Sequence, residues 1–201
     1  MPSIVCYWES NDMPRYALVL LIALTALSLN GCAPLMVGGA AATGIVVAED
    51  RRTVGTITED QAIELKASNR IGDRVKNGHV NVTSYNRMVL LTGEVPDAAA
   101  KATAEKTAQA VENVRGVYNE LVVGPNSALS ARANDTYITS LVKARFVDAQ
   151  RFSPVHVKVV TEASVVYLLG LVTRKEADAA TEIARTTRGV HRVVRVFEYI
   201  D

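Results

Sequence analysis

The chain has 201 residues, of which 49% are apolar and 5% aromatic, and its formal net charge is +1 at pH 7. This length suits one medium-sized domain or two small ones. The apolar content excludes a disordered chain, and the balanced charge argues against a nucleic-acid-binding protein. Because aromatic residues are few, we expect a core of Val, Leu, Ile and Ala.

Residues 1–31 are expected to form a signal peptide. The uncharged run Tyr16–Leu29 is shorter than the roughly 20 residues that cross a bilayer, but it has the length of a signal-peptide core. Arg15 precedes this run and supplies the usual positive charge. The stretch before Met13 is acidic, which is atypical of a signal peptide, so we expect translation to start at Met13.

The run ends in Leu29-Asn30-Gly31-Cys32, which resembles a bacterial lipobox. Such a cysteine receives diacylglycerol on its thiol and a further acyl chain on its amine. We therefore expect a covalent N-acyl diacylglycerol on Cys32 and no other cofactor. Two or three acyl chains make an effectively permanent anchor. Ala33 after the cysteine favours the periplasmic face of the outer membrane. The alternatives are an ordinary secretory signal with an incidental cysteine, and an uncleaved anchor.

The segment 32–58 is interpreted as the lipidated cysteine and a flexible tether. It is rich in Gly, Ala and Val and shows no helical periodicity. Arg51 and Arg52 within it are expected to be solvated, with contact to anionic headgroups as the alternative.

The remainder of the chain consists of two copies of one unit. HVNVTSYNRMVLLTGEV (79–95) and HVKVVTEASVVYLLGLV (156–172) share His, Val, Leu and Gly at a constant spacing. The copies predict one domain at 59–124 and a second at 134–201. A unit of about 65 residues is marginal for an independent core, so we expect the two to pack together, with stabilisation by the anchor as the alternative.

Each unit is predicted to have the order α-β-β-α-β. Apolar residues at helical spacing indicate a first helix, and in the second copy Asn134 or Asp135 is its expected N-cap. Alternating apolar residues then indicate a hairpin, and an Ala-rich helix and a last strand follow. Gly93 and Gly170 in the second strands are expected to let the next helix approach closely. The fold class is α+β, with the helices on one face of a small mixed three-stranded sheet.

These strings resemble the BON domain. The similarity is carried by VNVTSYNRMVLLTGEV, VYNEL, NDTYITSLVKAR, VKVVTE and LLGLVTRKEADAA. Two such domains behind a lipobox resemble the outer-membrane lipoproteins with two BON domains. The resemblance implies a periplasm-facing lipoprotein that maintains envelope integrity and gathers at division sites. It also implies that the first helix of the second domain binds anionic phospholipid, such as phosphatidylglycerol, and that Tyr137 is the aromatic residue entering the membrane.

The same helix can be judged from its residues alone. Tyr137 lies beside the apolar stripe, Thr136 and Ser140 point toward solvent, and Lys143 and Arg145 add positive charge. An exposed aromatic ring with nearby cations suits an anionic interface. The alternative is that Tyr137 caps the edge of the core and the cations are merely solvated. The first copy has Ala62 at the matching place, so we assign membrane contact to the second domain.

No catalytic or metal-binding pattern is evident. His79 and His156 are equivalent positions in separate copies, and His191 precedes the last strand, so we predict no metal site. With Cys32 acylated and Cys6 removed, no thiol chemistry remains. We expect a protein that is not an enzyme and binds no nucleic acid. The alternative function is a scaffold or assembly factor that binds outer-membrane or division proteins.

Overall fold

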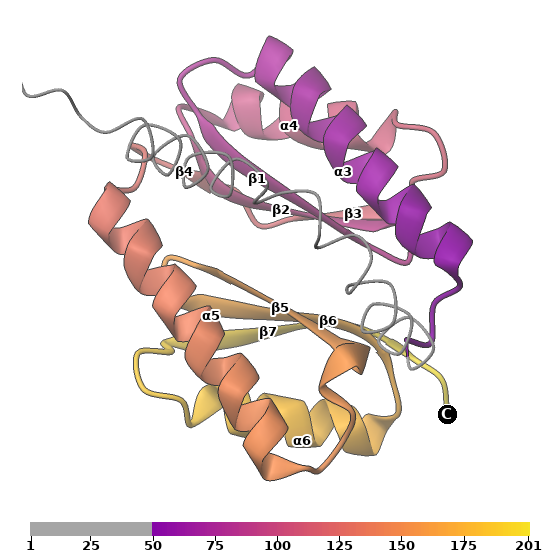
Figure 1. Cartoon of the computed structure of the whole chain (residues 1–201). Coiled ribbons are helices and arrows are strands. Elements are labelled where there is room, and N and C mark those ends of the chain that lie inside the picture. Colours follow the sequence, from indigo (N-terminus) through magenta and orange to yellow (C-terminus); the bar gives the residue numbers. More distant parts are fainter. Residues whose placement is uncertain (1–49) are drawn as a thin grey trace, which may run out of the picture. The chain divides into compact units, whose positions relative to one another are not determined.

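The computed structural model describes residues 50–201, which belong to one compact unit (Figure 1). The predictions for the signal peptide, for Cys32 and for the tether as far as residue 49 lie outside the described residues.

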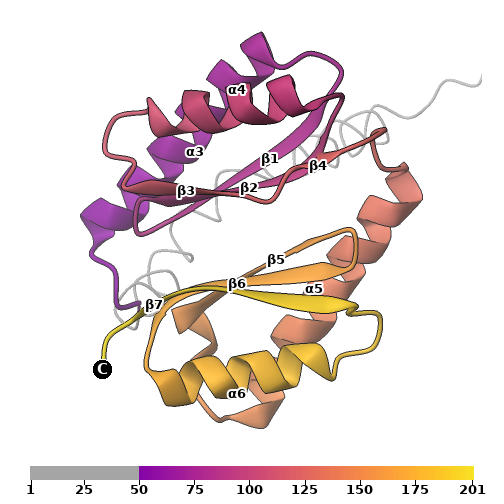
Figure 2. The same cartoon turned by 180° about the vertical axis from the view of Figure 1, so that it is seen from behind.

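The first domain is a two-layer α/β sandwich. Its elements are α3 (Val54–Arg74), β1 (His79–Tyr85), β2 (Met88–Val95), α4 (Ala98–Gln109), β3 (Gly116–Asn119) and β4 (Val122–Val123). Strand β2 pairs with β1 in antiparallel and with β3 and β4 in parallel fashion. Helices α3 and α4 cover the same face of this sheet (Figure 2).

The second domain repeats this arrangement. Its elements are α5 (Leu129–Ala149), the short 3-10 helix η1 (Pro154–His156), β5 (Val157–Glu162), β6 (Val165–Val172), α6 (Arg174–Arg185) and β7 (Arg192–Tyr199). Strand β6 lies between antiparallel β5 and parallel β7, and both helices cover one face of the sheet. The predicted fold class, two tandem α-β-β-α-β units with helices on one face, is confirmed.

The first helix begins earlier than predicted. Helix α3 starts at Val54, where the Thr53 side chain accepts a hydrogen bond from the Thr56 amide. The expectation of a tether is therefore wrong for residues 54–58. Arg52 is not merely solvated, because it forms ion pairs with Asp50 at 2.8 Å and with Asp60 at 2.9 Å.

The start of α5 was also predicted wrongly. Asp135 lies inside this helix and is buried, so it is not the N-cap. Its carboxylate instead accepts hydrogen bonds from the amides of Ala163 and Ser164, at 2.9 and 2.8 Å. These two residues form the tip of the β5–β6 hairpin, and both have positive φ, as a type I′ turn requires. The carboxylate thus serves the hairpin turn and not the helix end.

The two strand glycines allow close approach of the backbone on the hairpin's other side, and not of the next helix. A Cβ at Gly93 would collide with the carbonyl oxygen of His79, and one at Gly170 would collide with that of His156. His79 begins the antiparallel partner strand β1, and His156 is the last residue of η1, directly before the antiparallel partner strand β5. Gly93 also has φ +111°, in the region that side chains disfavour. A neighbouring segment does approach each glycine closely, as expected, but the prediction that this segment is the next helix was wrong.

The uncovered sheet faces of the two domains pack on each other. Each domain has its own core between sheet and helices. A third apolar cluster joins Tyr85 and Leu90 of the first domain to Tyr167, Leu169 and Val196 of the second. The expectation that the two copies pack together is therefore confirmed. Within residues 50–201, no helix is both long and apolar enough to cross a membrane.

Candidate functional site

Helix α5 presents one side to the core and the other to solvent. Ile138, Val142 and Phe146 are buried against the sheet and α6. Tyr137, whose position relative to the core was left open by the sequence, is 60% exposed. It therefore does not lie in the core of the second domain.

The exposed side of α5 forms an uncharged stripe along the whole helix. At about 100° per residue, six exposed positions fall within one quarter of the helix circumference. They are Leu129, Ala133, Tyr137, Ser140, Ala144 and Val147. Leu129 and Val147, at its two ends, are 82% and 60% exposed. The sequence interpretation missed both residues, because it placed the helix between Asp135 and Phe146, whereas α5 extends beyond both ends.

The predicted contact residues divide into two groups. Thr136, Ser140 and Lys143 are exposed on or beside this stripe, and the two hydroxyls donate to carbonyls one turn earlier in the helix. Arg145 lies elsewhere, because its guanidinium donates to the Ile183 carbonyl at 2.9 Å and to the Thr187 hydroxyl at 2.8 Å. Arg145 thus fastens α5 to the end of α6.

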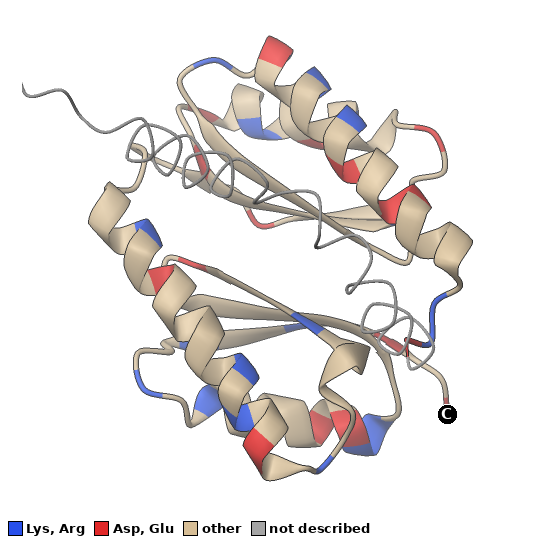
Figure 3. Ribbon diagram, in the orientation of Figure 1, with Lys and Arg blue, Asp and Glu red and all other residues tan. Residues whose placement is uncertain are grey.

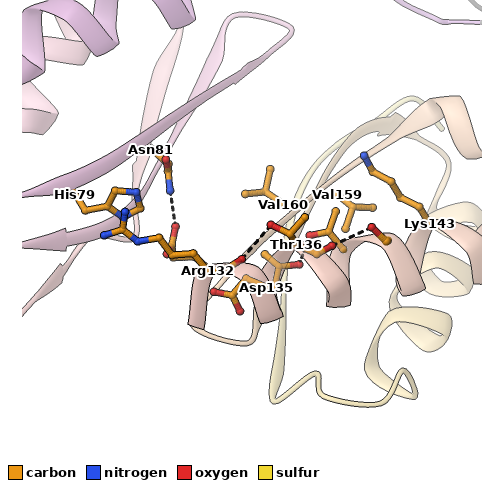
Figure 4. A pocket seen from close by; sticks show the side chains of 12 residues that line it. His79, Asn81, Arg132, Asp135, Thr136, Lys143, Val159 and Val160 are labelled. Atoms are coloured by element: carbon orange, nitrogen blue, oxygen red, sulfur yellow. Dashed lines mark hydrogen bonds between the residues drawn. The ribbon is translucent and has the colours of Figure 1, made fainter. Parts of the chain in front are cut away.

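A groove of about 500 Å³ runs beside the stripe (Figure 4). Its wall on α5 carries Arg132 and Lys143 and the hydroxyls of Thr136, Thr139 and Ser140. Strand β5 and the start of β1 form the opposite wall. Lys143 makes no ion pair with any described residue, so its charge is available to a ligand. Arg132 is a further cation that the sequence interpretation did not select.

The corresponding helix of the first domain has a different surface. Figure 3 shows charges of both signs along α3, whereas the middle of α5 between Asp135 and Lys143 is uncharged. Ala62 and Leu65 are exposed on α3, but Lys66 and Asp73 interrupt the apolar surface. The exposed faces of the two helices therefore differ in charge.

Histidine and acidic side chains gather at the contact between the domains. His79 Nδ1 lies 3.5 Å from Glu94 Oε2, and Glu162 is near both. Burial raises the pKa of the Glu162 carboxyl, although a hydrogen bond from Asn81 partly offsets this effect. His79 therefore has acidic neighbours that its position in the sequence did not reveal.

A second polar contact between the domains involves the start of α6. Arg51 donates to both carboxylate oxygens of Glu176, at 2.7 and 2.9 Å. Hydrogen bonding from Arg51 lowers the pKa of Glu176 to about 2, against a desolvation effect that would raise it. Glu176 also forms the capping box of α6 with Thr173.

The chain belongs to the BON domain family, whose profile matches residues 59–125 and 134–201. It is 40% identical over 192 residues to the outer membrane lipoprotein DolP of Haemophilus influenzae, covering 94% of this chain and 98% of that protein. It is 32% identical to the 21 kDa hemolysin of Actinobacillus pleuropneumoniae, covering 75% of this chain and 79% of the relative. It is 33% identical to the osmotically-inducible protein Y of Escherichia coli, covering 70% and 72% respectively. The predicted resemblance to outer-membrane lipoproteins with two BON domains is confirmed.

Proposed function

We infer that this chain is a lipoprotein on the periplasmic face of the outer membrane, and that α5 binds anionic phospholipid there. By this binding it maintains the integrity of the outer membrane at division sites. The protein is a binding module and not an enzyme. The observation that carries the proposal is the uncharged exposed stripe of α5, with Tyr137 at its middle and Lys143 beside it.

The stripe has the chemistry of an interfacial membrane contact. A tyrosine ring can bury its body among acyl chains while its hydroxyl stays hydrated. Leu129 and Val147 extend the apolar surface over about 27 Å of helix, and small residues separate the three large side chains. A bilayer is flat on this scale, so all three side chains can reach it at once.

The cations favour an anionic surface over a neutral one. Lys143 and Arg132 line the groove on one side of the stripe, and Arg151 is exposed in the loop after α5. Each such cation contributes about 1 kcal/mol near an anionic membrane. Hydroxyl groups in the groove offer hydrogen bonds to a headgroup.

The anchor rests on the lipobox and on the relatives. Cys32 in its Leu-Asn-Gly-Cys context would carry the N-acyl diacylglycerol, and the relative from H. influenzae is described as an outer membrane lipoprotein. The acyl chains would hold the protein at a membrane, whereas α5 would select anionic regions within it.

Vesicle binding by the unlipidated chain from residue 33 onward tests the role of α5. We expect it to sediment with vesicles containing phosphatidylglycerol and not with neutral ones. Tyr137→Glu should abolish sedimentation, because it places a carboxylate in the middle of the stripe. Tyr118→Glu is the matched control, since Tyr118 is also exposed but lies in the first domain.

Equal sedimentation of the Tyr137→Glu variant and the unchanged chain would overturn the proposal. Circular dichroism melting of both variants should match that of the unchanged chain, because both tyrosines are solvent-exposed.

A second candidate function is a scaffold or assembly factor for envelope proteins. The open edge of the first sheet favours it, because Val122, Val123 and Tyr118 are all exposed there. Unpaired edge strands can accept an extended segment of a partner. Crosslinking that recovers one outer-membrane or division protein, and that is lost with Tyr118→Glu but kept with Tyr137→Glu, would support this candidate.

A further inference from the structure

Three side chains with metal-ligating groups converge between the domains. His79 begins β1, Glu94 lies near the end of β2, and Glu162 ends β5 of the second domain. His79 and Glu94 face each other across the β1–β2 ladder. One ligand atom from each of the three side chains lies within 4.8 Å of the others. Residues far apart in the sequence therefore form one compact cluster.

Each of the two carboxylates is held in place by a hydrogen-bond donor and can still bind a cation. The Ser127 amide donates to Glu94 Oε2 at 3.1 Å, and the Asn81 side chain donates to Glu162 Oε2 at 2.7 Å, as drawn in Figure 4. An ionised carboxylate has about four lone-pair sites, so one donor leaves most of its capacity to bind a cation. Hydrogen bonds of this kind orient metal ligands in known sites. Both glutamates are more than nine-tenths buried, so their conformations are restricted.

The imidazole of His79 gives separate support for a bound cation. Its Nδ1 atom is buried, yet it has no hydrogen-bond partner among residues 50–201. The nearest carboxylate oxygen is 3.5 Å away, which is an electrostatic contact and not a hydrogen bond. A buried polar atom without a partner costs free energy. A bound cation would remove that cost and would also reduce the repulsion between the two carboxylates.

We propose that His79, Glu94 and Glu162 bind one divalent transition-metal ion, Zn²⁺ being the best match, and that this ion joins the two domains. The proposal goes beyond membrane binding and does not depend on it. One nitrogen and two carboxylate oxygens suit Zn²⁺, with water in a fourth position. Mg²⁺ and Ca²⁺ prefer sites made of oxygen alone, so the histidine disfavours them.

Arg132 is the nearby positive charge that opposes such an ion. It lines the same groove as His79 and Glu162 (Figure 4). Its Nε donates to the Ser127 hydroxyl at 3.1 Å, and no ion pair links it to Glu94 or Glu162 within the described part of the chain. Both carboxylates are therefore able to bind a metal ion without first breaking an ion pair with Arg132.

Calorimetric titration of the chelator-treated chain with ZnCl₂ tests the site. We expect one Zn²⁺ ion per chain, a higher melting temperature with the ion, and no comparable effect of MgCl₂. His79→Gln and Glu162→Gln should each weaken Zn²⁺ binding at least about tenfold. His191→Gln is the matched control, because His191 is exposed and lies outside the cluster.

Two outcomes would overturn the proposal. One is absence of Zn²⁺ binding by the unchanged chain. The other is loss of binding in His191→Gln to the same extent as in His79→Gln, which would indicate adventitious histidine binding. If Glu162→Gln fails to fold, the partly exposed His79 provides the decisive variant, with folding verified by its melting temperature without metal.

Discussion

A buried aspartate holds the hairpin turn of each domain. Asp60 accepts hydrogen bonds from the amides of Asn86 and Arg87 at 2.8 and 2.7 Å, as Asp135 does from the equivalent turn of the second domain. A carboxylate can accept two adjacent amides at once, and such charge-assisted bonds are about twice as strong as neutral ones. Asp60 is also paired with Arg52, whereas Asp135 has no such ion pair within residues 50–201.

Replacing Asp135 should therefore destabilise the second domain. We expect Asp135→Ala to lower the free energy of unfolding by about 1 to 3 kcal/mol, since two turn amides lose their acceptor. Urea unfolding followed by circular dichroism measures this change. Asp148→Ala is the matched control on the same helix, because Asp148 is exposed, and should alter stability by less than about 0.5 kcal/mol. Equal effects of the two substitutions would contradict this role of Asp135.

The equivalence of Asp60 and Asp135 was visible in the sequence, but their role was not. An aspartate near the apparent start of a helix has the pattern of an N-cap, and local sequence cannot distinguish a local acceptor from a distant one. The true partners are turn amides that follow about 30 residues later. Only the fold brings them together.

At the scale of the element, α5 is longer than its apolar pattern indicates. The extra turns contain Leu129, Ala131 and Ala133, which favour helix but contribute nothing to the core. A prediction based on core-facing periodicity therefore could not include them. The first strand of each hairpin was predicted from its alternating apolar residues, such as Val80 and Val82 in β1.

The extended start of α5 has a measurable consequence for membrane binding. We expect Leu129→Ser to weaken binding to phosphatidylglycerol vesicles, because it removes about 2 kcal/mol of apolar contact at one end of the stripe. Leu65→Ser is the matched control, since Leu65 is 65% exposed but lies on α3. Sedimentation with vesicles compares the two variants. Weaker binding by Leu65→Ser than by Leu129→Ser would place the contact on the first domain.

At the scale of the whole molecule, the two domains are joined by apolar and polar contacts. Besides the apolar cluster, Lys158 pairs with Glu64 at 2.7 Å, and Arg115 pairs with Glu198 at 2.9 Å. The size of the repeat predicted that the copies would pack together, but not which faces would meet. The faces follow from the fold, because helices cover only one side of each sheet.

The Arg51–Glu176 pair makes part of this contact dependent on pH. The folded-state pKa of Glu176 is about 2, below the ordinary 4.5, so its ionised form stabilises the folded state. This contribution is complete above about pH 5 and is lost as the pH falls toward 2. We expect Glu176→Gln to cost about 1 to 2 kcal/mol at neutral pH, with allowance for solvent screening, and almost nothing near pH 2.

Urea unfolding of the unchanged chain and of Glu176→Gln across this pH range measures the difference. Glutamine keeps the capping position of α6 usable, so the loss reports on the ion pair. Glu182→Gln is the control, because Glu182 is more exposed and its ion pair is with nearby Arg185 on the same helix. A Glu176→Gln deficit that persists unchanged at low pH would contradict the assignment.

The contact between the open sheet faces does not require both faces to come from one chain. Residues 124–128 form the short connection between β4 and α5. If this connection extended away from the first domain, the second domain of one chain would pack on the first domain of a neighbouring chain. Two chains exchanging halves in this way would reproduce the same contacts reciprocally, as in other domain-swapped dimers. The paired molecule would carry two copies of the α5 stripe.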